Sequence, residues 1–169
     1  YESAWVWEHQ ALTRARFCAG DAAIGERFES IRTAVLCKER DPAKLAEEVL
    51  NMRARMRDAH PNRTALFDLK HDEGGMIDVE FIVQYLILRH APQYPQLAGN
   101  WGNITLLRMV AELGLVEAQL ASGVGDAYRA MRRLQHQSRL QGLEAARVAP
   151  ELVEPHAANV LRLWQTTFG

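Results

Sequence analysis

The residues best suited to chemistry lie in one segment, Phe67 to Phe81, which reads Phe-Asp-Leu-Lys-His-Asp-Glu-Gly-Gly-Met-Ile-Asp-Val-Glu-Phe. It places a lysine before two adjacent glycines and two carboxylates after them: Lys70, Gly74, Gly75, Asp78 and Glu80. A glycine pair at the start of a helix leaves backbone N–H groups free at the positive end of the helix dipole, which favours a phosphate. The segment therefore indicates an anion site, although glycines at helix starts more often have a purely structural role.

The two carboxylates admit two interpretations. Asp78 and Glu80 are about 200° apart around a helix, so a regular helix cannot direct both into one cleft. In the first interpretation they complement the helix dipole, and Asp78 pairs with Lys70 or with a neighbouring arginine. In the second, one carboxylate holds Lys70 or a substrate hydroxyl, while the other helps to bind a metal-nucleotide or polarises an attacking group. The residue pattern leaves both open.

The elements that must position this segment are helices. Apolar residues recur at helical spacing along most of the chain, for example at Ile24, Phe28, Ile31 and Val35. No alternating run of strand length occurs, and at most Phe67 to Leu69 is extended. The predicted fold is an all-α bundle of about seven helices with an irregular Gly-Gly turn before the central helix. The predicted helices cover residues 1–18, 21–40, 42–60, 81–90, 103–113, 117–141 and a last one from Pro150.

Composition excludes several classes of protein. The chain has 169 residues, 48% of them hydrophobic, with a net charge of −1, which fits a single domain over 1–169 without a general attraction for nucleic acid or membranes. Only Cys18 and Cys37 are cysteines, and the six histidines show no ligand spacing, so we expect no metal site and a cytoplasmic location. No apolar run is long enough to span a bilayer. Because the chain starts at Tyr1, we expect a fragment of a longer protein.

Arginines and tryptophans have less specific interpretations. We interpret two arginine groups as solvated helix faces rather than basic patches, and we assign the tryptophans to core packing. The arginines are Arg53, Arg55, Arg57 and Arg63, then Arg132, Arg133 and Arg139; the tryptophans are Trp5, Trp7, Trp101 and Trp164.

Two stretches of the chain resemble bacterial glutamine synthetase adenylyltransferase, also called glutamate-ammonia-ligase adenylyltransferase. One is the opening Trp5-Val-Trp-Glu-His-Gln-Ala-Leu-Thr-Arg-Ala-Arg16, and the other runs from Phe67 to Leu86, followed by the helix over 103–113. The likeness covers essentially the whole chain and is most specific between Lys70 and Gln84.

The resemblance implies a C-terminal helical domain from the AMP-attaching half of a large multidomain nucleotidyltransferase. In the parent reaction, AMP passes from ATP, with Mg²⁺, to a tyrosine hydroxyl of glutamine synthetase, tuned by glutamine and the PII signalling protein. The residues carried over form a nucleotide-binding set and a catalytic set: Lys70, Gly74, Gly75 and Arg16, then Asp78 and Glu80. The metal-binding aspartates of the family have no counterpart here, so we expect the fragment alone to be inactive and to bind neither Mg²⁺ nor ATP.

Three hypotheses follow for the role of this chain. In the first, the helical domain closes over an upstream nucleotidyltransferase core of the same protein and lends it Lys70 and a carboxylate. In the second, it is a regulatory module that docks glutamine synthetase or PII, and the glycine segment is only a rigid turn. The third, an RNA-binding bundle, depends on the arginine cluster alone.

Overall fold

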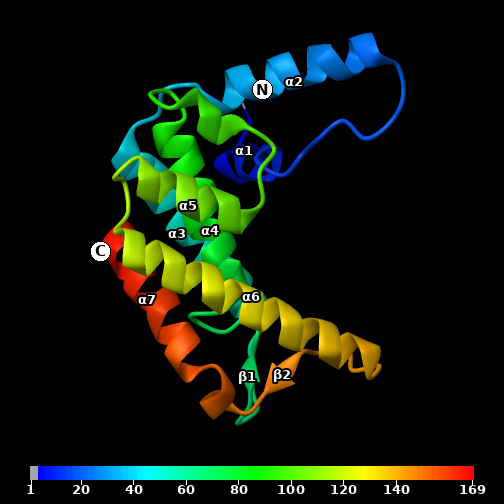
Figure 1. The fold of residues 1–169 in the computed structure, drawn as a ribbon, viewed down its shortest axis with the longest axis vertical. Helices are drawn as coiled ribbons and strands as arrows, with labels where there is room; N and C mark the ends of the chain where they lie inside the picture. The colour runs from blue at the N-terminus through cyan, green and yellow to red at the C-terminus, as the bar shows by residue number, and fades with distance from the viewer. Residues whose placement is uncertain (1–3) are drawn as a thin grey trace.

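A computed structural model describes residues 4–169 and confirms the predicted all-α architecture. Seven α-helices, two short 3-10 helices and a two-stranded ribbon follow one another along the described chain (Figure 1). The elements are α1 (Val6–Leu12), α2 (Ala22–Leu36), α3 (Pro42–Ala59), β1 (Phe67–Asp68), α4 (Met76–His90), η1 (Pro95–Ala98), α5 (Asn103–Glu112), α6 (Ala118–Leu140), β2 (Arg147–Val148), η2 (Pro150–Leu152) and α7 (Glu154–Phe168).

The central helix α4 forms the middle of the core. It packs against α1, α3, α5, α6, α7 and η1, and most of its side chains are buried around the whole circumference. A helix that is apolar all round is stable only when neighbours cover every face. The sequence MIDVEFIVQYLILRH satisfies this condition, so the polar groups at its start lie inside the bundle rather than in solvent.

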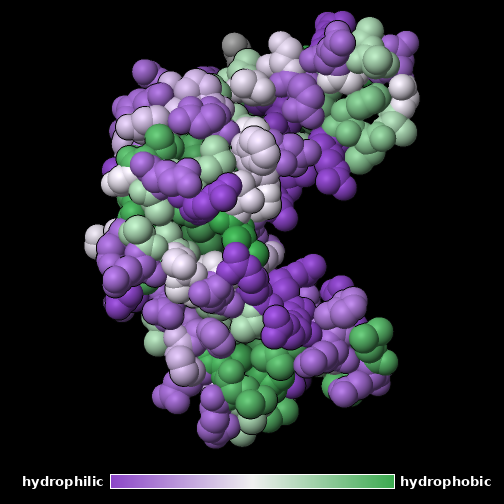
Figure 2. All heavy atoms as spheres, in the orientation of Figure 1, coloured by the Kyte–Doolittle hydropathy of each residue, from purple (hydrophilic) through white to green (hydrophobic). Residues whose placement is uncertain are grey.

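The helices form a crescent. In Figure 1, α2 projects from one end, and the C-terminal half of α6 projects from the other on the same side. The space-filling view in Figure 2 shows the concave face between these two arms. The β1–β2 ribbon lies below α6, at the same end as the lower arm.

Tertiary contacts shorten the first helix. We predicted a helix over 1–18, of which residues 1–3 lie outside the described part, but α1 ends at Leu12. The guanidinium of Arg32, on α2, binds the end of the helix: it donates hydrogen bonds to the carbonyl oxygens of Leu12 (2.8 Å) and Thr13 (3.2 Å). It also donates to Ala98 O (2.7 Å), so one buried arginine joins α1, α2 and η1.

The exposed aromatic and aliphatic residues differ from the prediction. Three of the tryptophans assigned to the core, Trp5, Trp7 and Trp101, are about half exposed or more, and only Trp164 packs against the core. The stripe on α2 is also open, since Ile24 is 66% and Ile31 43% exposed. These side chains fit a helical period but have little of this chain to pack against.

Candidate functional site

The glycine turn connects β1 to α4 and is held from both sides. Phe67 and Asp68 pair antiparallel with Val148 and Arg147 of β2, and the next residue, Leu69, is fully buried. Gly74 has φ +81°, which only glycine adopts without strain, and a Cβ there would lie 2.9 Å from the carbonyl oxygen of Ala157 on α7. Gly74 is therefore required by both backbone conformation and close packing.

The backbone amides of the glycine pair and of the first residues of α4 are engaged. The amide of Gly74 donates to Asp78 Oδ2 (2.7 Å), and that of Gly75 to Asp72 O (3.0 Å). Met76 N donates to Leu69 O (2.9 Å) and Ile77 N to Lys70 O (3.2 Å). The expectation of free N–H groups for a phosphate is therefore wrong, because the turn folds back on itself and supplies its own acceptors.

Asp78 is a buried ion-pair partner. Its side chain accepts from Arg53 Nε (2.5 Å), and both side chains are at most 6% exposed. Arg53 Nη2 also donates to His71 O (2.8 Å), so this side chain links α3 to the turn. Burial raises the pKa of Asp78, and the hydrogen bond from Arg53 opposes that rise. The structure thus gives the pairing with a neighbouring arginine that the first interpretation of Asp78 required.

Arg53 itself contradicts the sequence interpretation. We assigned it to a solvated face, but it is 5% exposed because α3 lays this face against α4. Arg55, Arg57 and Arg63 are exposed as expected. The four arginines therefore do not act as one basic patch, and the RNA-binding hypothesis loses the cluster on which it depended.

Glu80 lies on the other side of α4 from Asp78, as the helical spacing required. It is half-buried and accepts a hydrogen bond from the hydroxyl of Tyr128 on α6 (3.0 Å). Burial raises the pKa of Tyr128, and the charge of Glu80 acts in the same direction. On the same face, Gln84 accepts from Gln10 Nε2 (3.0 Å), so the polar groups of α4 are bonded to three different helices.

Lys70 is the exposed cation of the turn. Its backbone amide and that of His71 both donate to Asp68 Oδ1 at 3.0 Å. Burial alone would raise the pKa of Asp68, but these amide hydrogen bonds, with the charges of His71 and Arg147, bring it below its usual value. Asp68 thus holds the backbone of Lys70 and His71 in place. Its position one residue before a buried leucine was the only sequence signal for this role.

Arg16 is not close to the turn in this chain. It is exposed in the connection between α1 and α2, which runs into the upper arm in Figure 1, whereas Lys70 follows β1 at the lower end. The structure thus brings Lys70, Gly74, Gly75 and Asp78 together, places Glu80 one helical face away, and leaves Arg16 on the connection between α1 and α2.

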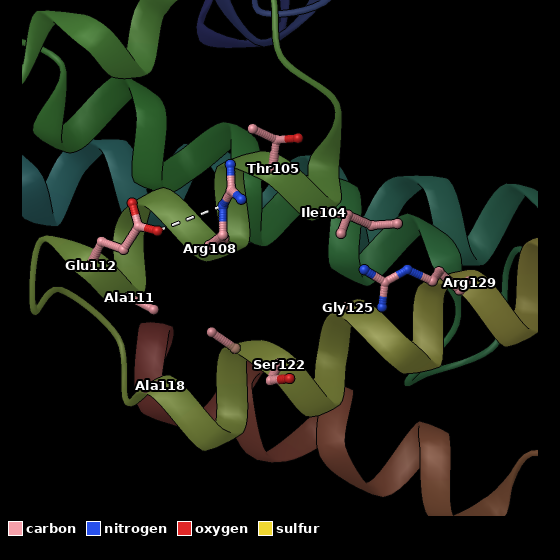
Figure 3. Close-up of a pocket in the computed structure, with 10 residues that line it drawn as sticks. Ile104, Thr105, Arg108, Ala111, Glu112, Ala118, Ser122, Gly125 and Arg129 are labelled. Atoms are coloured by element: carbon pink, nitrogen blue, oxygen red, sulfur yellow. Dashed lines mark ion pairs between the residues drawn. The ribbon is translucent and has the colours of Figure 1, made fainter.

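A separate pocket lies between α5 and α6 and contains none of the predicted site residues. It has a volume of about 540 Å³, and its polar lining includes the ion pair of Arg108 with Glu112 and the side chain of Arg129 (Figure 3). Within residues 4–169, no group of three or more His, Cys, Asp or Glu side chains is placed to hold a metal ion. None of the helices in that range is long and apolar enough to cross a membrane.

Comparison with known proteins gives a consistent result. The chain is 58% identical over 168 residues to a bifunctional glutamine synthetase adenylyltransferase/adenylyl-removing enzyme of Aromatoleum aromaticum, which covers 99% of this chain and 18% of that protein. Proteins of the same name from Nitrosomonas eutropha and Burkholderia mallei are 50% and 54% identical over 100% and 99% of this chain. The chain spans about a fifth of the length of these curated relatives.

A family comparison covers most of the fold. Residues 43–160, from the start of α3 into α7, match the family described as GlnD PII-uridylyltransferase. This range contains the glycine turn, α4 and α6, with every predicted site residue except Arg16. The resemblance to glutamine synthetase adenylyltransferases predicted from the sequence is confirmed, and the chain belongs to the GlnD PII-uridylyltransferase family.

Proposed function

We propose that this chain is one helical domain of a longer bifunctional enzyme that adenylylates and deadenylylates glutamine synthetase. Similarity over nearly the whole chain to enzymes of that name supports the proposal. Mg²⁺ and ATP would then bind in a nucleotidyltransferase core outside this chain, which transfers AMP to a tyrosine hydroxyl. Such an enzyme would regulate nitrogen assimilation in the cytoplasm.

Within that enzyme, we assign Lys70 to the nucleotide. This assignment depends on one observation: the side chain of Lys70 is exposed, on a turn that the buried Arg53–Asp78 pair holds in place. A cation near a transferring phosphoryl group stabilises the charge that develops on it. Gly74 and Gly75 shape the turn, and Asp78 acts as a positioning residue.

Glu80 and Arg16 complete the proposed set. Asp78 is occupied by Arg53, so we assign Glu80 the role at the reacting groups. The hydroxyl of Tyr128 orients its carboxylate. Arg16 would meet the nucleotide only if the upstream core fills the concave side between the two arms (Figure 2).

The test is Lys70→Ala in the full-length enzyme. We expect adenylylation of glutamine synthetase to fall, with an unchanged far-UV circular dichroism spectrum. Lys44→Ala removes another exposed lysine, from the first turn of α3, and should leave activity unchanged. Normal turnover by the Lys70 variant would remove the catalytic part of the proposal.

A docking module is the second candidate function, and the open stripe on α2 favours it. Ile24 and Ile31 are exposed on a projecting helix, and such apolar surface marks interaction sites in soluble proteins. The candidate partners are glutamine synthetase and PII. Calorimetry of the isolated chain with each protein, without ATP, distinguishes the candidates: binding that Ile24→Asp abolishes favours docking, and no binding to either protein rejects it.

A further inference from the structure

We propose that Arg14 is a positioning residue for Glu80. It acts through Asn103 and Tyr128, and we call these four side chains the Glu80 chain. They come from the connection after α1, the first position of α5, the middle of α6 and the start of α4, so the chain joins parts of the bundle that are distant in sequence. The inference depends on the role proposed for Glu80 and adds two residues to it.

The first argument is the geometry at the two ends of the Glu80 chain. Arg14 Nη1 donates to Asn103 Oδ1 (2.8 Å), although the two residues are 89 positions apart. At the other end, the Tyr128 hydroxyl donates to Glu80 Oε1 (3.0 Å). Asn103 is 4% and Tyr128 9% exposed, so water has little access to the middle of the chain. Polar groups in such a place are oriented by one another rather than by solvent.

The second argument is the direction of each hydrogen bond. A guanidinium can only donate, so Arg14 holds the Oδ1 end of the Asn103 amide and leaves Nδ2 for another partner. Burial and the charge of Glu80 raise the pKa of Tyr128, and the side chain of Asn103 opposes that rise as a donor to the hydroxyl oxygen. A tyrosine hydroxyl has one proton, which then goes to Glu80. All donors therefore point one way, from the cation of Arg14 to the carboxylate of Glu80.

The middle contact is the loosest of the three. Within residues 4–169, Asn103 Nδ2 is buried and has no acceptor at ordinary hydrogen-bond length and angle, although it is near enough to Tyr128 to affect its pKa. Catalytic hydrogen bonds are often long or poorly aligned until the reacting groups are bound. An unmade buried hydrogen bond is costly, so a small shift of Asn103 toward Tyr128 is favourable. The Arg14–Asn103 pair thus limits where the Tyr128 hydroxyl and the Glu80 carboxylate can settle.

Neighbouring polar groups are engaged elsewhere. Arg132 lies one turn after Tyr128 on α6 and affects it by its charge, but its Nη1 donates to Gln135 Oε1 (2.9 Å). Gln84, on the same face of α4 as Glu80, accepts from Gln10 Nε2. Arg14 is therefore the cation whose hydrogen bond sets the orientation of the Asn103 amide.

The experiment compares Arg14→Met, Tyr128→Phe and the double variant in the full-length enzyme. We expect each single variant to lower kcat for adenylylation by about tenfold or more with little change in the KM for ATP, because a misplaced reacting group slows the chemical step. The double variant should be no slower than Tyr128→Phe alone, since both changes break the same chain. Arg55→Met removes an exposed arginine of α3 and should keep full activity.

A spectroscopic measurement separates orientation from general damage. Tyrosine labelled with carbon-13 at Cζ reports the hydrogen bonds of its hydroxyl, and the Tyr128 signal is assigned by its loss in Tyr128→Phe. In the 169-residue chain, this signal should shift in Arg14→Met while the far-UV circular dichroism spectrum stays unchanged. An unmoved signal, or losses of activity that add in the double variant, would overturn the inference.

Glu80→Gln in the full-length enzyme distinguishes this inference from the proposal on which it depends. Normal adenylylation by that variant would reject the role of Glu80, and the inference with it. Impaired adenylylation by Glu80→Gln together with normal turnover by Arg14→Met would reject the inference alone.

Discussion

The buried pair of Arg53 and Asp78 gives the sharpest test of how this fold is held together. Asp78→Ala would remove the carboxylate that faces Arg53 Nε and accepts from the amide of Gly74. Both side chains are at most 6% exposed, so water cannot replace the lost partner. Breaking a buried ion pair from one side costs about 3–5 kcal/mol, because the other charge stays buried without compensation. Domains have only about 5–15 kcal/mol of stability, so the effect should be large.

Urea unfolding followed by far-UV circular dichroism measures this effect. With a slope of about 2 kcal/mol per M, a loss of about 4 kcal/mol lowers the midpoint by roughly 2 M. Arg57→Ala is the matched control: Arg57 is one helical turn along α3 and also pairs with an acid of the turn, but both partners are more than half exposed. Its removal should cost at most about 1 kcal/mol. If Asp78→Ala costs no more than Arg57→Ala, the buried pair does not hold the turn.

Three further predictions concern the groups around this pair. Asp68 has a lowered pKa, so its carboxylate stabilises the fold above its unfolded pKa of about 3.9, and this stability is lost as pH falls through the lower folded value. Asp68→Asn should therefore reduce the fall of the unfolding free energy at acid pH, as measured by urea unfolding at several pH values. Gly74→Ala should cost about 2–4 kcal/mol of unfolding free energy. Gly142→Ala, where φ is +76° but nothing lies within 4 Å, should cost about 1 kcal/mol. Equal decreases in the melting temperature of the two variants would show that the contact with α7 is unimportant. Arg32→Ala should speed amide hydrogen exchange in α2 while α4 stays protected, as read by mass spectrometry; uniform protection would contradict its role as the anchor of α2.

Local patterns predicted much of the fold. The helical period, with proline and aspartate at starts such as Asp41-Pro42, predicted α3 to its last residue within one position. The run from Phe81 to His90 is so apolar that a buried central helix was predicted without tertiary information, although α4 begins earlier than predicted, at Met76. The Gly-Gly turn was also placed correctly, because glycine at positive φ is a property of the residue itself.

The predictions that failed concern partners distant in sequence. Arg53 and Asp78 are 25 residues apart, and no periodicity states which arginine on α3 will face α4. The free amides expected in the turn depended on whether Leu69, Lys70 and Asp72 would fold back as acceptors. Trp5 and Ile24 have core-like chemistry, yet they are exposed because no element within residues 4–169 covers them.

By itself, the sequence determined that this protein is a helical bundle with one polar turn before a buried central helix, because side-chain period and glycine conformation are local properties. Only the tertiary structure decided what the polar residues do there. Packing of α3 and α7 against the turn buried Asp78 with Arg53, left Lys70 in solvent and separated it from Arg16. Charge pairing and exposure follow from which helix faces meet, and these faces are set by the whole bundle.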